Sequence, residues 1–364
     1  MSEFTERVAS ALRAFERGEM IVVTDDDDRE NEGDLICAAS LATPEQIAFM
    51  VRHTSGIVCA PMTADVARRL NLSPMVAEND APLSTAFTVS VDVRHGLTTG
   101  ISAEERTNTV RALANNNSGA VDFVRPGHVF PLVARSGGVL IRSGHTEAAV
   151  DLCALTSLPP VGVLAELVND DGTVMRGPEV DEFAKTHNLV QVSVNDLIAW
   201  RQRHERLVDR VGEDVQILAG VRAQVVTFRT QFDPLHHIAV VVGDIRDGVD
   251  VPVRLIREDV MLDVFGNGPA ELVQHLGARG RGLLIYLRHG AVGVAAPEDE
   301  DHGTAQSRAR EWRDVGLGAQ ILRDLGVSSI RLLSSTDRRY VGLEGFGIAI
   351  TGTEPLPAAG EGTQ

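Results

Sequence analysis

Residues 25–34, DDDDRENEGD, contain seven carboxylates, one arginine, one asparagine and one glycine. The run follows the apolar segment EMIVVTD (19–25) and leads into LICAAS (35–40), so we expect it at the end of a strand. Two carboxylates ~5 Å apart repel by about 0.8 kcal/mol in water and by about 3 kcal/mol at an effective dielectric near 20. Several partly buried carboxylates therefore need raised pKa values or a cation, and a hard divalent cation prefers oxygen ligands.

The acidic run does not match a calcium-binding EF-hand loop. With Asp28 as the first position, Gly33 takes the sixth position as required, but the twelfth is Ala39, where the loop needs a bidentate glutamate. The flanking segments are predicted strands, whereas an EF-hand is flanked by helices. Two interpretations stay open, a solvated acidic loop and a cation site at a strand end.

A glycine-rich segment later in the chain could bind an anion. RSGGVLIRSGHTEA (135–148) leads into a predicted helix, and backbone N–H groups at such a junction bind phosphate or carboxylate. Arg142 would add a charged fork. His145 opens the helix, and a single histidine is structural about as often as it is a ligand, so both roles stay open.

Two further segments place ionisable side chains among apolar ones. RPGHVFPL (125–132) puts Arg125 and His128 in a predicted loop bounded by prolines. VGVLAELV (161–168) is a predicted buried strand that contains Glu166. A buried glutamate is more often paired structurally, but a raised pKa would make it a general acid or base. No G-x-S-x-G, P-loop or dinucleotide glycine pattern is present.

The composition limits the class of protein. The formal net charge is −17 and aromatic residues make up 4% of the chain, so we expect no nucleic-acid partner. Cys37, Cys59 and Cys153 form no C-x-x-C pair, which predicts a reducing, cytoplasmic location without a disulfide framework. The apolar runs are too short to span a bilayer and the charged N-terminus is unlike a signal peptide, so we expect no membrane partner.

Alternating strand and helix patterns must position these side chains, and they predict an α+β fold. Thr43 with Pro44, and Ser102 with Glu105, are typical of helix starts. The predicted strands are 19–25, 84–93, 161–168, 224–230, 237–245, 251–256, 281–289 and 329–334. The predicted helices are 43–56, 102–115, 145–156, 195–210, 268–280 and 316–326.

The length predicts two domains. The polar helix predicted at 195–210 could bridge them, and we place the boundary near residue 203. The predicted domains are 1–203 and 204–355, and the Pro/Gly-rich tail 356–364 is predicted to be disordered.

Seven segments, in order over nearly all of residues 1–203, resemble 3,4-dihydroxy-2-butanone 4-phosphate synthase of riboflavin biosynthesis. They are DDDDRENEGDL, RHTSGIVCAPM, TAFTVSVD, TTGISAEERTNTVRAL, RPGHVFPL, GGVLIRSGHTEAAVDL and GVLAELVNDDGTVMRGPE. The resemblance implies an α+β fold and a homodimer through the N-terminal domain. It also implies that D-ribulose 5-phosphate is converted to 3,4-dihydroxy-2-butanone 4-phosphate plus formate, with Mg²⁺ or Mn²⁺ as the cofactor.

The same resemblance implies roles for individual residues. Glu30 and His145 match the metal ligands. The positions that match catalytic residues are His128, Glu166, Glu32 and Cys59, with Asp25 as a further member of the site. The positions that match substrate contacts are Arg29, Glu30, Asp34, Thr109, Arg142, Ser143, Gly144, His145, Thr146 and Glu166.

The second half resembles GTP cyclohydrolase II but lacks the residues of its chemistry. The resemblance is carried by VPVRLIREDVMLDVFG, RGRGLLIYLR, GLGAQILRDLGVSSIRLLS and VGLEGFGI. That family holds zinc with three cysteines; the first falls at Asp259, and no cysteine follows Cys153. Its catalytic glycine–arginine loop is RHGAVGVAA (288–296) here, and an expected tyrosine is Val315. We therefore predict a degenerate domain with neither zinc nor GTP cyclohydrolase II activity.

Three hypotheses stay open. The first is a monofunctional synthase with a degenerate partner domain. The second is a bifunctional enzyme that also opens GTP with altered metal ligands, drawn from His236, His237 or His289. The third is a non-catalytic scaffold or nucleotide sensor, which the acidic, glycine–histidine and Glu166 motifs weigh against.

Overall fold

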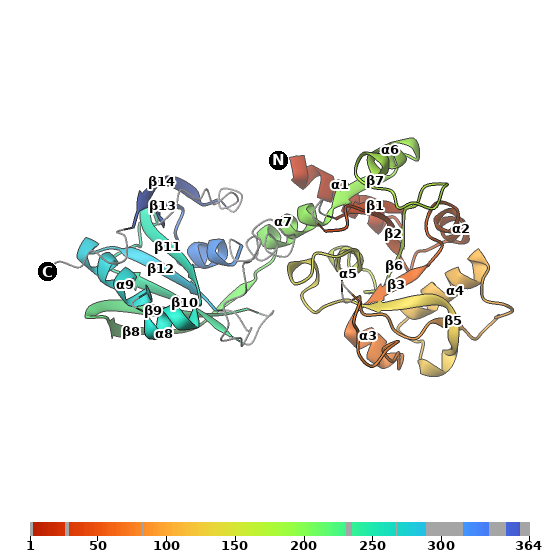
Figure 1. The fold of residues 1–364 in the computed structure, drawn as a ribbon, viewed down its shortest axis with the longest axis horizontal. Coiled ribbons are helices and arrows are strands. Elements are labelled where there is room, and N and C mark those ends of the chain that lie inside the picture. Colours follow the sequence, from red (N-terminus) through yellow and green to blue (C-terminus); the bar gives the residue numbers. More distant parts are fainter. Residues whose placement is uncertain are drawn as a thin grey trace. The chain divides into compact units, whose positions relative to one another are not determined.

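The chain folds into two compact units, Met1–Arg201 and Gln202–Gln364, each built on one seven-stranded sheet (Figure 1). The structure, a computed structural model, describes residues 3–25, 29–81, 83, 85–230, 235–266, 268–288, 316–334 and 347–356. None of the helices in these ranges is both long and apolar enough to cross a membrane.

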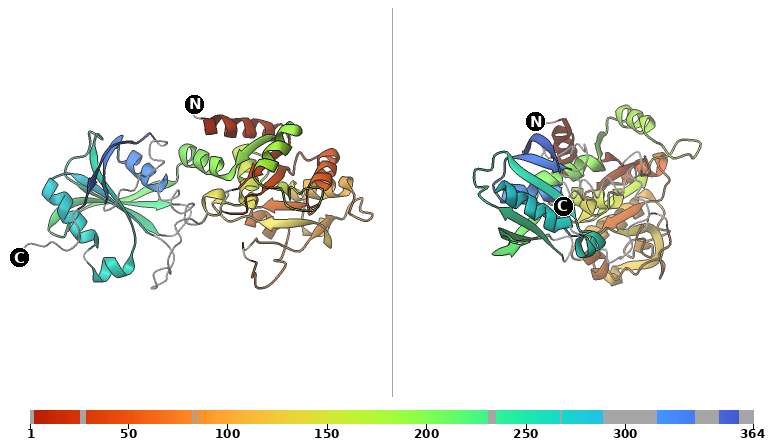
Figure 2. Two further views of the ribbon diagram at one scale, coloured as in Figure 1. Left: turned by 45° about the horizontal axis from the view of Figure 1, so that its top comes forward. Right: turned by 60° about the vertical axis from the view of Figure 1, so that its left-hand side comes forward.

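The first unit is a mixed sheet with the strand order β4-β5-β3-β6-β2-β1-β7. Its strands are β1 (Ile21–Thr24), β2 (Gly33–Ala38), β3 (Cys59–Met62), β4 (Val91–Val93), β5 (Phe123–Val133), β6 (Gly162–Glu166) and β7 (Val190–Ser193). Its helices are α1 (Glu3–Glu16), α2 (Pro44–His53), α3 (Ala64–Arg69), α4 (Ala103–Ala114), α5 (His145–Leu155), α6 (Pro178–Thr186) and α7 (Val194–His204), with short 3₁₀ turns at Ala120–Asp122 and Gly138–Leu140. Figure 2 gives two further views of these elements.

Both faces of this sheet are covered, so its central strands are buried on both sides. Along β2, Leu35 and Cys37 belong to the apolar core that also contains residues of α2, α4 and α6. Asp34 and Ile36 point to the opposite face, because successive side chains of a strand alternate. Helix α5 packs on that opposite face, where a Cβ on Gly162 would lie 2.9 Å from the Cβ of Ala149. The face under α5 is the one that carries the ionisable residues.

The helix starts follow the capping signals in the sequence. Thr43 caps α2 with a reciprocal capping box that includes Gln46, as the Thr43–Pro44 pair predicted. Ser102 caps α4 and accepts the N–H of Glu105 at 3.1 Å. The carboxylate of Glu105 does not complete a capping box; it accepts the N–H and hydroxyl of Thr98 instead, and these bonds lower its pKa to about 2.

In the first unit one predicted element was wrong in type and two differed in their bounds. Residues 125–132 are not a loop but part of β5; a proline lacks only the N–H donor, and the carbonyl of Pro131 still accepts the N–H of Thr88 at 3.0 Å. Of the strand predicted at 84–93, only the last part forms a regular strand, β4 (Val91–Val93). The helix predicted at 195–210 ends at His204 in α7, and the chain then enters a strand at Val208.

The second unit has the strand order β14-β13-β11-β12-β10-β9-β8. Its strands are β8 (Val208–Leu218), β9 (Val221–Thr230), β10 (His236–Val242), β11 (Val251–Arg257), β12 (Gly282–Leu287), β13 (Ser329–Ser334) and β14 (Ala349–Pro355); its helices are α8 (Val260–Phe265), α9 (Gly268–Arg279) and residues 316–324. Val273 and Leu276 of α9 pack on the apolar core with Val240, Val242 and Leu284. The sequence prediction missed β8, α8 and β14. The tail predicted to be disordered lies, from residue 357 on, outside the described residues.

Gly127 allows the close approach of β4 to β5, beside His128. A Cβ at this position would lie 2.0 Å from the carbonyl carbon of Val91 and 2.2 Å from the nitrogen of Asp92. We expect Gly127→Ala to lower stability by about 1–3 kcal/mol, because β4 must shift, which lowers the thermal midpoint by about 2–4 °C per kcal/mol. Circular dichroism melting measures this. Gly119→Ala is the matched control, since nothing lies within 4 Å of its Cβ position; equal midpoints for the two variants would contradict the prediction.

Candidate active site and metal centre

The carboxylate of Asp25 organises the acidic segment that follows β1. It is buried and accepts hydrogen bonds from the guanidinium of Arg29 (2.7 Å), the N–H of Glu30 (3.2 Å) and the N–H of Glu32 (2.9 Å). Arg29 also forms an ion pair with Glu30. Asn31 takes a left-handed conformation (φ 54°) that helps to turn the chain back toward β2. Asp26, Asp27 and Asp28 lie outside the described residues.

Three of the predicted site residues share the sheet face under α5. Asp34 of β2 pairs directly with Glu166 of β6, and paired residues point to the same side of a sheet. Cys59 of β3 pairs with Leu164, two residues before Glu166. Asp34, Glu166 and Cys59 therefore lie on one face, toward one end of three neighbouring strands.

His145 reaches this face as the first residue of α5. Its Nδ1 lies 3.8 Å from an oxygen of Asp34 and 3.9 Å from an oxygen of Glu30. Ligand atoms of Asp25, Glu30 and His145 all lie within 4.8 Å of one another, and no other group of three such residues was found in the described part of the chain. The structure thus brings His145 next to Glu30, although the two residues are far apart in the sequence.

The cluster fits a divalent cation. Among the described residues, Oδ1 of Asp34 and Nε2 of His145 are buried and have no hydrogen-bond partner, as expected for groups that face a ligand. Burial lowers the pKa of His145 to about 4, so its ring is neutral at pH 7 and has a lone pair to offer. Carboxylate oxygens and a neutral imidazole suit Mg²⁺ or Mn²⁺.

The neighbouring acids hold protons more tightly than usual. Burial, followed by the charges of Glu166 and Glu30, raises the pKa of Asp34 well above its ordinary value. Glu166, expected to be buried, is exposed at the end of β6. Partial removal from water and, after it, the charge of Glu32 raise its pKa. Burial, with a further contribution from Asp34, raises the pKa of the Cys59 thiol to about 12. Cys59 is therefore a neutral thiol at pH 7, and the nucleophilic thiolate form is disfavoured.

The glycine-rich segment before α5 is held by a buried ion pair. Arg142 donates to Glu147 at 2.7 Å, and Glu147 also accepts the N–H of Arg135 at 2.9 Å. A Cβ on Gly144 would lie 2.3 Å from the Arg142 guanidinium, so the segment packs tightly. Of the other predicted contacts in this segment, Ser143 is half-buried and Thr146 is buried in the first turn of α5.

His128 lies on β5 and is oriented by Asp92 of β4. The buried carboxylate of Asp92 accepts the backbone N–H of His128 at 2.9 Å and lies 2.7 Å from its Nδ1. Because a carboxylate only accepts, Nδ1 of His128 carries a proton and donates it to Asp92. Gly100 (φ 88°) closes over this pair, where a Cβ would lie 2.2 Å from an Asp92 oxygen.

The sheet register relates His128 to the acidic cluster. Cys59 pairs with Phe130 of β5 as well as with Leu164 of β6, so His128 and Glu166 each lie two residues from a partner of Cys59, in the same direction and on the same face. Two strand spacings separate β5 from β6, about 10 Å.

Two predicted site residues, Thr109 and Glu32, have mainly structural contacts, and so does Arg125. Thr109 is fully buried in α4; its hydroxyl accepts the N–H of Val93 and donates to the carbonyl of Glu105, both at 3.0 Å. Arg125 donates to backbone carbonyls, including that of Leu70 at 2.7 Å. Glu32 accepts from Arg176 at 2.9 Å, a cation that the sequence analysis did not consider.

Asp92, Glu147 and Arg176 are the residues that sequence reasoning missed. Asp92 is an inward-pointing acid in a predicted strand, and Glu147 follows the Gly-His pair within a helix. Both acids lie in segments that the sequence predicts to be buried. They could have been recognised as site residues, because a buried charge needs a partner. Arg176 had no comparable signal.

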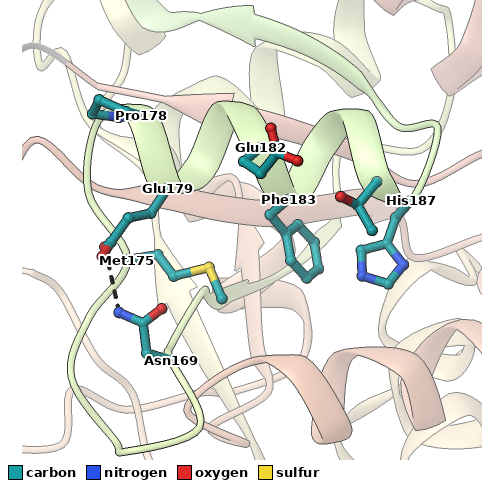
Figure 3. A pocket seen from close by; sticks show the side chains of 8 residues that line it. Asn169, Met175, Pro178, Glu179, Glu182, Phe183 and His187 are labelled. Carbon is teal, nitrogen blue, oxygen red and sulfur yellow. Dashed lines mark hydrogen bonds between the residues drawn. The ribbon is translucent and has the colours of Figure 1, made fainter.

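A separate hollow of about 480 Å³ lies beside α6 (Figure 3). The thioether of Met175 and the ring of Phe183 lie side by side in it, and Asn169 donates to Glu179 at its edge. Its lining residues are Asn169, Met175, Pro178, Glu179, Glu182, Phe183, Thr186 and His187. No predicted site residue lines it, so this hollow is not the acidic cluster.

Comparison with known proteins identifies the family. Residues 9–200 match the 3,4-dihydroxy-2-butanone 4-phosphate synthase model, and residues 212–355 match that of GTP cyclohydrolase II. The chain is 45% identical to the bifunctional riboflavin biosynthesis protein RIBA 1, chloroplastic, of Arabidopsis thaliana, over 96% of this chain and 68% of that protein. The chain belongs to the fused synthase–cyclohydrolase family. It is therefore a 3,4-dihydroxy-2-butanone 4-phosphate synthase of riboflavin biosynthesis.

Two solved structures support the assignment for this synthase. RibBX of A. baumannii, a two-domain 3,4-dihydroxy-2-butanone 4-phosphate synthase, superposes with a TM-score of 0.79 at 34% identity, over 96% of this chain and 99% of that one. A 3,4-dihydroxy-2-butanone 4-phosphate synthase in complex with two magnesium ions superposes with a TM-score of 0.53 at 44% identity, over 54% of this chain and 97% of that one. The predicted fold of two mixed α/β domains is confirmed.

The second unit of the synthase has several polar contacts around Asp259, Asp263 and His237. Asp259, predicted to match the first zinc cysteine, donates its N–H to the carboxylate of Asp263 at 2.9 Å. The hydroxyl of Tyr286 donates to the same carboxylate. His237 is buried in β10 and accepts the N–H of Arg288 at 3.2 Å.

Of the other residues in the cyclohydrolase comparison, one lies within the described part of this unit. His236 is exposed at the start of β10. His289, the loop 289–296 and Val315 lie outside the described residues.

We predict that replacing Glu30 weakens metal binding. Glu30→Gln removes one anionic oxygen ligand from the cluster, and ligand charge largely sets affinity in hard-cation sites. The dissociation constant for Mn²⁺, measured by electron paramagnetic resonance at pH 7, should rise at least about 10-fold. Glu104→Gln, an exposed acid on α4, is the matched control and should bind as wild type. Unchanged Mn²⁺ affinity in Glu30→Gln would remove Glu30 from the ligand set.

Proposed function

We propose that the N-terminal unit converts D-ribulose 5-phosphate to 3,4-dihydroxy-2-butanone 4-phosphate and formate with Glu30 and His145 as the ligands of Mg²⁺ or Mn²⁺. The observation that carries this proposal is the convergence of Asp25, Glu30 and His145 within 4.8 Å. The magnesium complex of a related synthase supports the choice of metal. When bound, the cation would polarise carbonyl and hydroxyl oxygens and favour enediolate charge.

Glu166 is the proposed proton carrier at the reacting carbons. The reaction enolises a ketose phosphate, loses water, rearranges the carbon skeleton and releases formate, so it needs groups that can both take and give protons. The raised pKa of Glu166 makes it a stronger proton acceptor than an ordinary glutamate while it can still return the proton. Glu32, held by Arg176, and His128, held by Asp92, are proposed to serve other carbons. Cys59 would act as a neutral neighbour of Asp34 and Glu166.

The proposed phosphate site is the segment 142–146 at the start of α5. Backbone N–H groups at a helix N-terminus attract anions. Arg142 is already paired with Glu147. We therefore propose that it positions the segment 142–146, in addition to any contact that it makes with the phosphate. Arg29, Asp34 and Thr109 stay predicted substrate contacts; Thr109, whose hydroxyl is engaged by the backbone, would act through β4.

We predict that Glu166→Gln loses formate release. The amide keeps the size of the side chain but cannot exchange a proton, so kcat should fall by about 10²–10⁴-fold. Formate release from ribulose 5-phosphate with Mg²⁺ measures this. Glu182→Gln, on α6, is the control and should turn over normally. Turnover of Glu166→Gln within a few-fold of wild type would exclude Glu166 as the proton carrier.

We infer that the C-terminal unit does not open GTP. No cysteine follows Cys153, and a single carboxylate at Asp259 cannot replace three thiolates for zinc. In the described residues of this unit no three His, Cys, Asp or Glu ligand atoms converge. The rival hypotheses stay a bifunctional enzyme with altered ligands, which the name of the Arabidopsis relative favours, and a scaffold or nucleotide sensor. The homodimer and the cytoplasmic location stay predictions.

The C-terminal proposal predicts that purified protein releases no formate from GTP and carries no stoichiometric zinc. Ribulose 5-phosphate in the same preparation is the positive control. Zinc by plasma mass spectrometry and formate from GTP are the measurements. One zinc per chain together with formate from GTP would establish the bifunctional alternative.

A further inference from the structure

Helix α5 presents two buried acids, Glu147 and Asp151, which lie one turn apart. Glu147 pairs with Arg142, whereas Asp151 pairs with Arg201 of α7 at 2.7 Å. The side chain of Asp151 is 9% exposed and that of Arg201 is 12% exposed, so both charges lie largely out of water. The reaction proposed for the acidic cluster gives this second ion pair no role.

The pair of Asp151 and Arg201 holds the backbone turn Gly138–Leu140. The carboxylate of Asp151 accepts the N–H of Val139 at 2.9 Å, and Arg201 donates to the carbonyl of Gly137 at 2.8 Å. One guanidinium nitrogen of Arg201 makes the bonds both to Asp151 and to Gly137. Each member of the ion pair is therefore bonded to the backbone of this turn or of the residue before it.

Two glycines let the turn lie directly on the carboxylate. Gly137 and Gly138 have φ values of 95° and 62°, in the left-handed region that favours glycine. A Cβ on Gly138 would lie 2.0 Å from Oδ1 of Asp151. The position of the carboxylate therefore sets the position of the turn.

The turn also fixes the start of the segment 142–146. The carbonyl of Gly138 accepts the N–H of Ile141 at 2.9 Å and the N–H of Arg142 at 3.1 Å. A shift of the turn would therefore move the backbone N–H groups that follow it, which must point at phosphate oxygens. Misplacement of a substrate-binding group by ~1 Å can cost about 10²-fold in rate.

We propose that Asp151 and Arg201 are positioning residues for the phosphate group of ribulose 5-phosphate. The ion pair fixes the turn Gly138–Leu140, and the turn fixes the segment 142–146. A charge-assisted pair is strong enough for this role, because hydrogen bonds between two ionised groups are short and directional. The inference rests on the proposed function, since it takes the segment 142–146 as the phosphate site.

Steady-state kinetics of formate release from ribulose 5-phosphate with Mg²⁺ test the inference in the full chain. Arg201→Gln should raise KM at least about 10-fold and change kcat less than about 3-fold, because it weakens ground-state and transition-state binding alike. The constant for competitive inhibition by inorganic phosphate should rise with KM. A purely structural ion pair would lower the thermal midpoint and leave both constants unchanged.

Two further variants separate positioning from stability. Arg7→Gln is the matched control, because Arg7 of α1 pairs with Asp196 of the same helix α7 at 2.9 Å; its KM should stay within about 2-fold of wild type. Arg201→Lys should return KM to within about 3-fold of wild type, because one ammonium group has enough protons for both bonds that one guanidinium nitrogen makes.

A double variant covers the case in which Arg201→Gln does not fold because Asp151 is left as an unpaired buried charge. Asp151→Asn/Arg201→Gln removes both charges and should show the same rise in KM. A folded variant whose KM and phosphate inhibition match wild type would overturn the inference, and so would an equal rise in KM for Arg7→Gln. A wild type that releases no formate would refute the proposed function, and the inference with it.

Discussion

The arrangement of the active site depends on the hydrogen bonds that the carboxylate of Asp25 accepts. It accepts from the side chain of Arg29 and from the backbone of Glu30 and Glu32, and so it folds the acidic segment back over the end of β1. Without these bonds the segment would be a solvated run of like charges, because anions in water separate. With them, Glu30 lies 3.9 Å from His145, and Glu32 is near enough to raise the pKa of Glu166. The fold thus collects anions on one covered face of a sheet.

That concentration of charge is offset in two ways. Arg29, Arg142 and Arg176 each pair with an acid, and these pairs fix geometry. Asp34 has a raised pKa because it is buried and faces other acids, and the exposed Glu166 has a raised pKa because it is partly removed from water and lies near Glu32. The ion pairs of the three arginines fix the geometry of the site. Asp34 and Glu166 can hold and release the protons that the reaction needs. A cation at Glu30 and His145 would lower the repulsion that remains, which is why metal binding and proton transfer belong to one account.

The sequence indicated candidate residues for this site but not how they come together. Glu30, His145 and Glu166 were found from an improbable density of charge and from motifs that resemble a known family. Their proximity could not be derived from periodicity, because it depends on the pairing of β2 with β6 and on the packing of α5. Strand β5 was missed since prolines were taken as loop signals, although only their N–H is lost from a ladder. Asp92 was not recognised because alternation along a strand predicts which face a residue is on. It does not predict the partner of that residue, here His128.

The most direct test of the account is a crystal of the protein soaked with Mn²⁺ and ribulose 5-phosphate, measured at the manganese absorption edge. We predict an anomalous peak between the carboxylate of Glu30 and the imidazole of His145, with sugar density facing Glu166. An ordered sugar with no manganese at these two side chains, or manganese bound only elsewhere in the chain, would contradict the account.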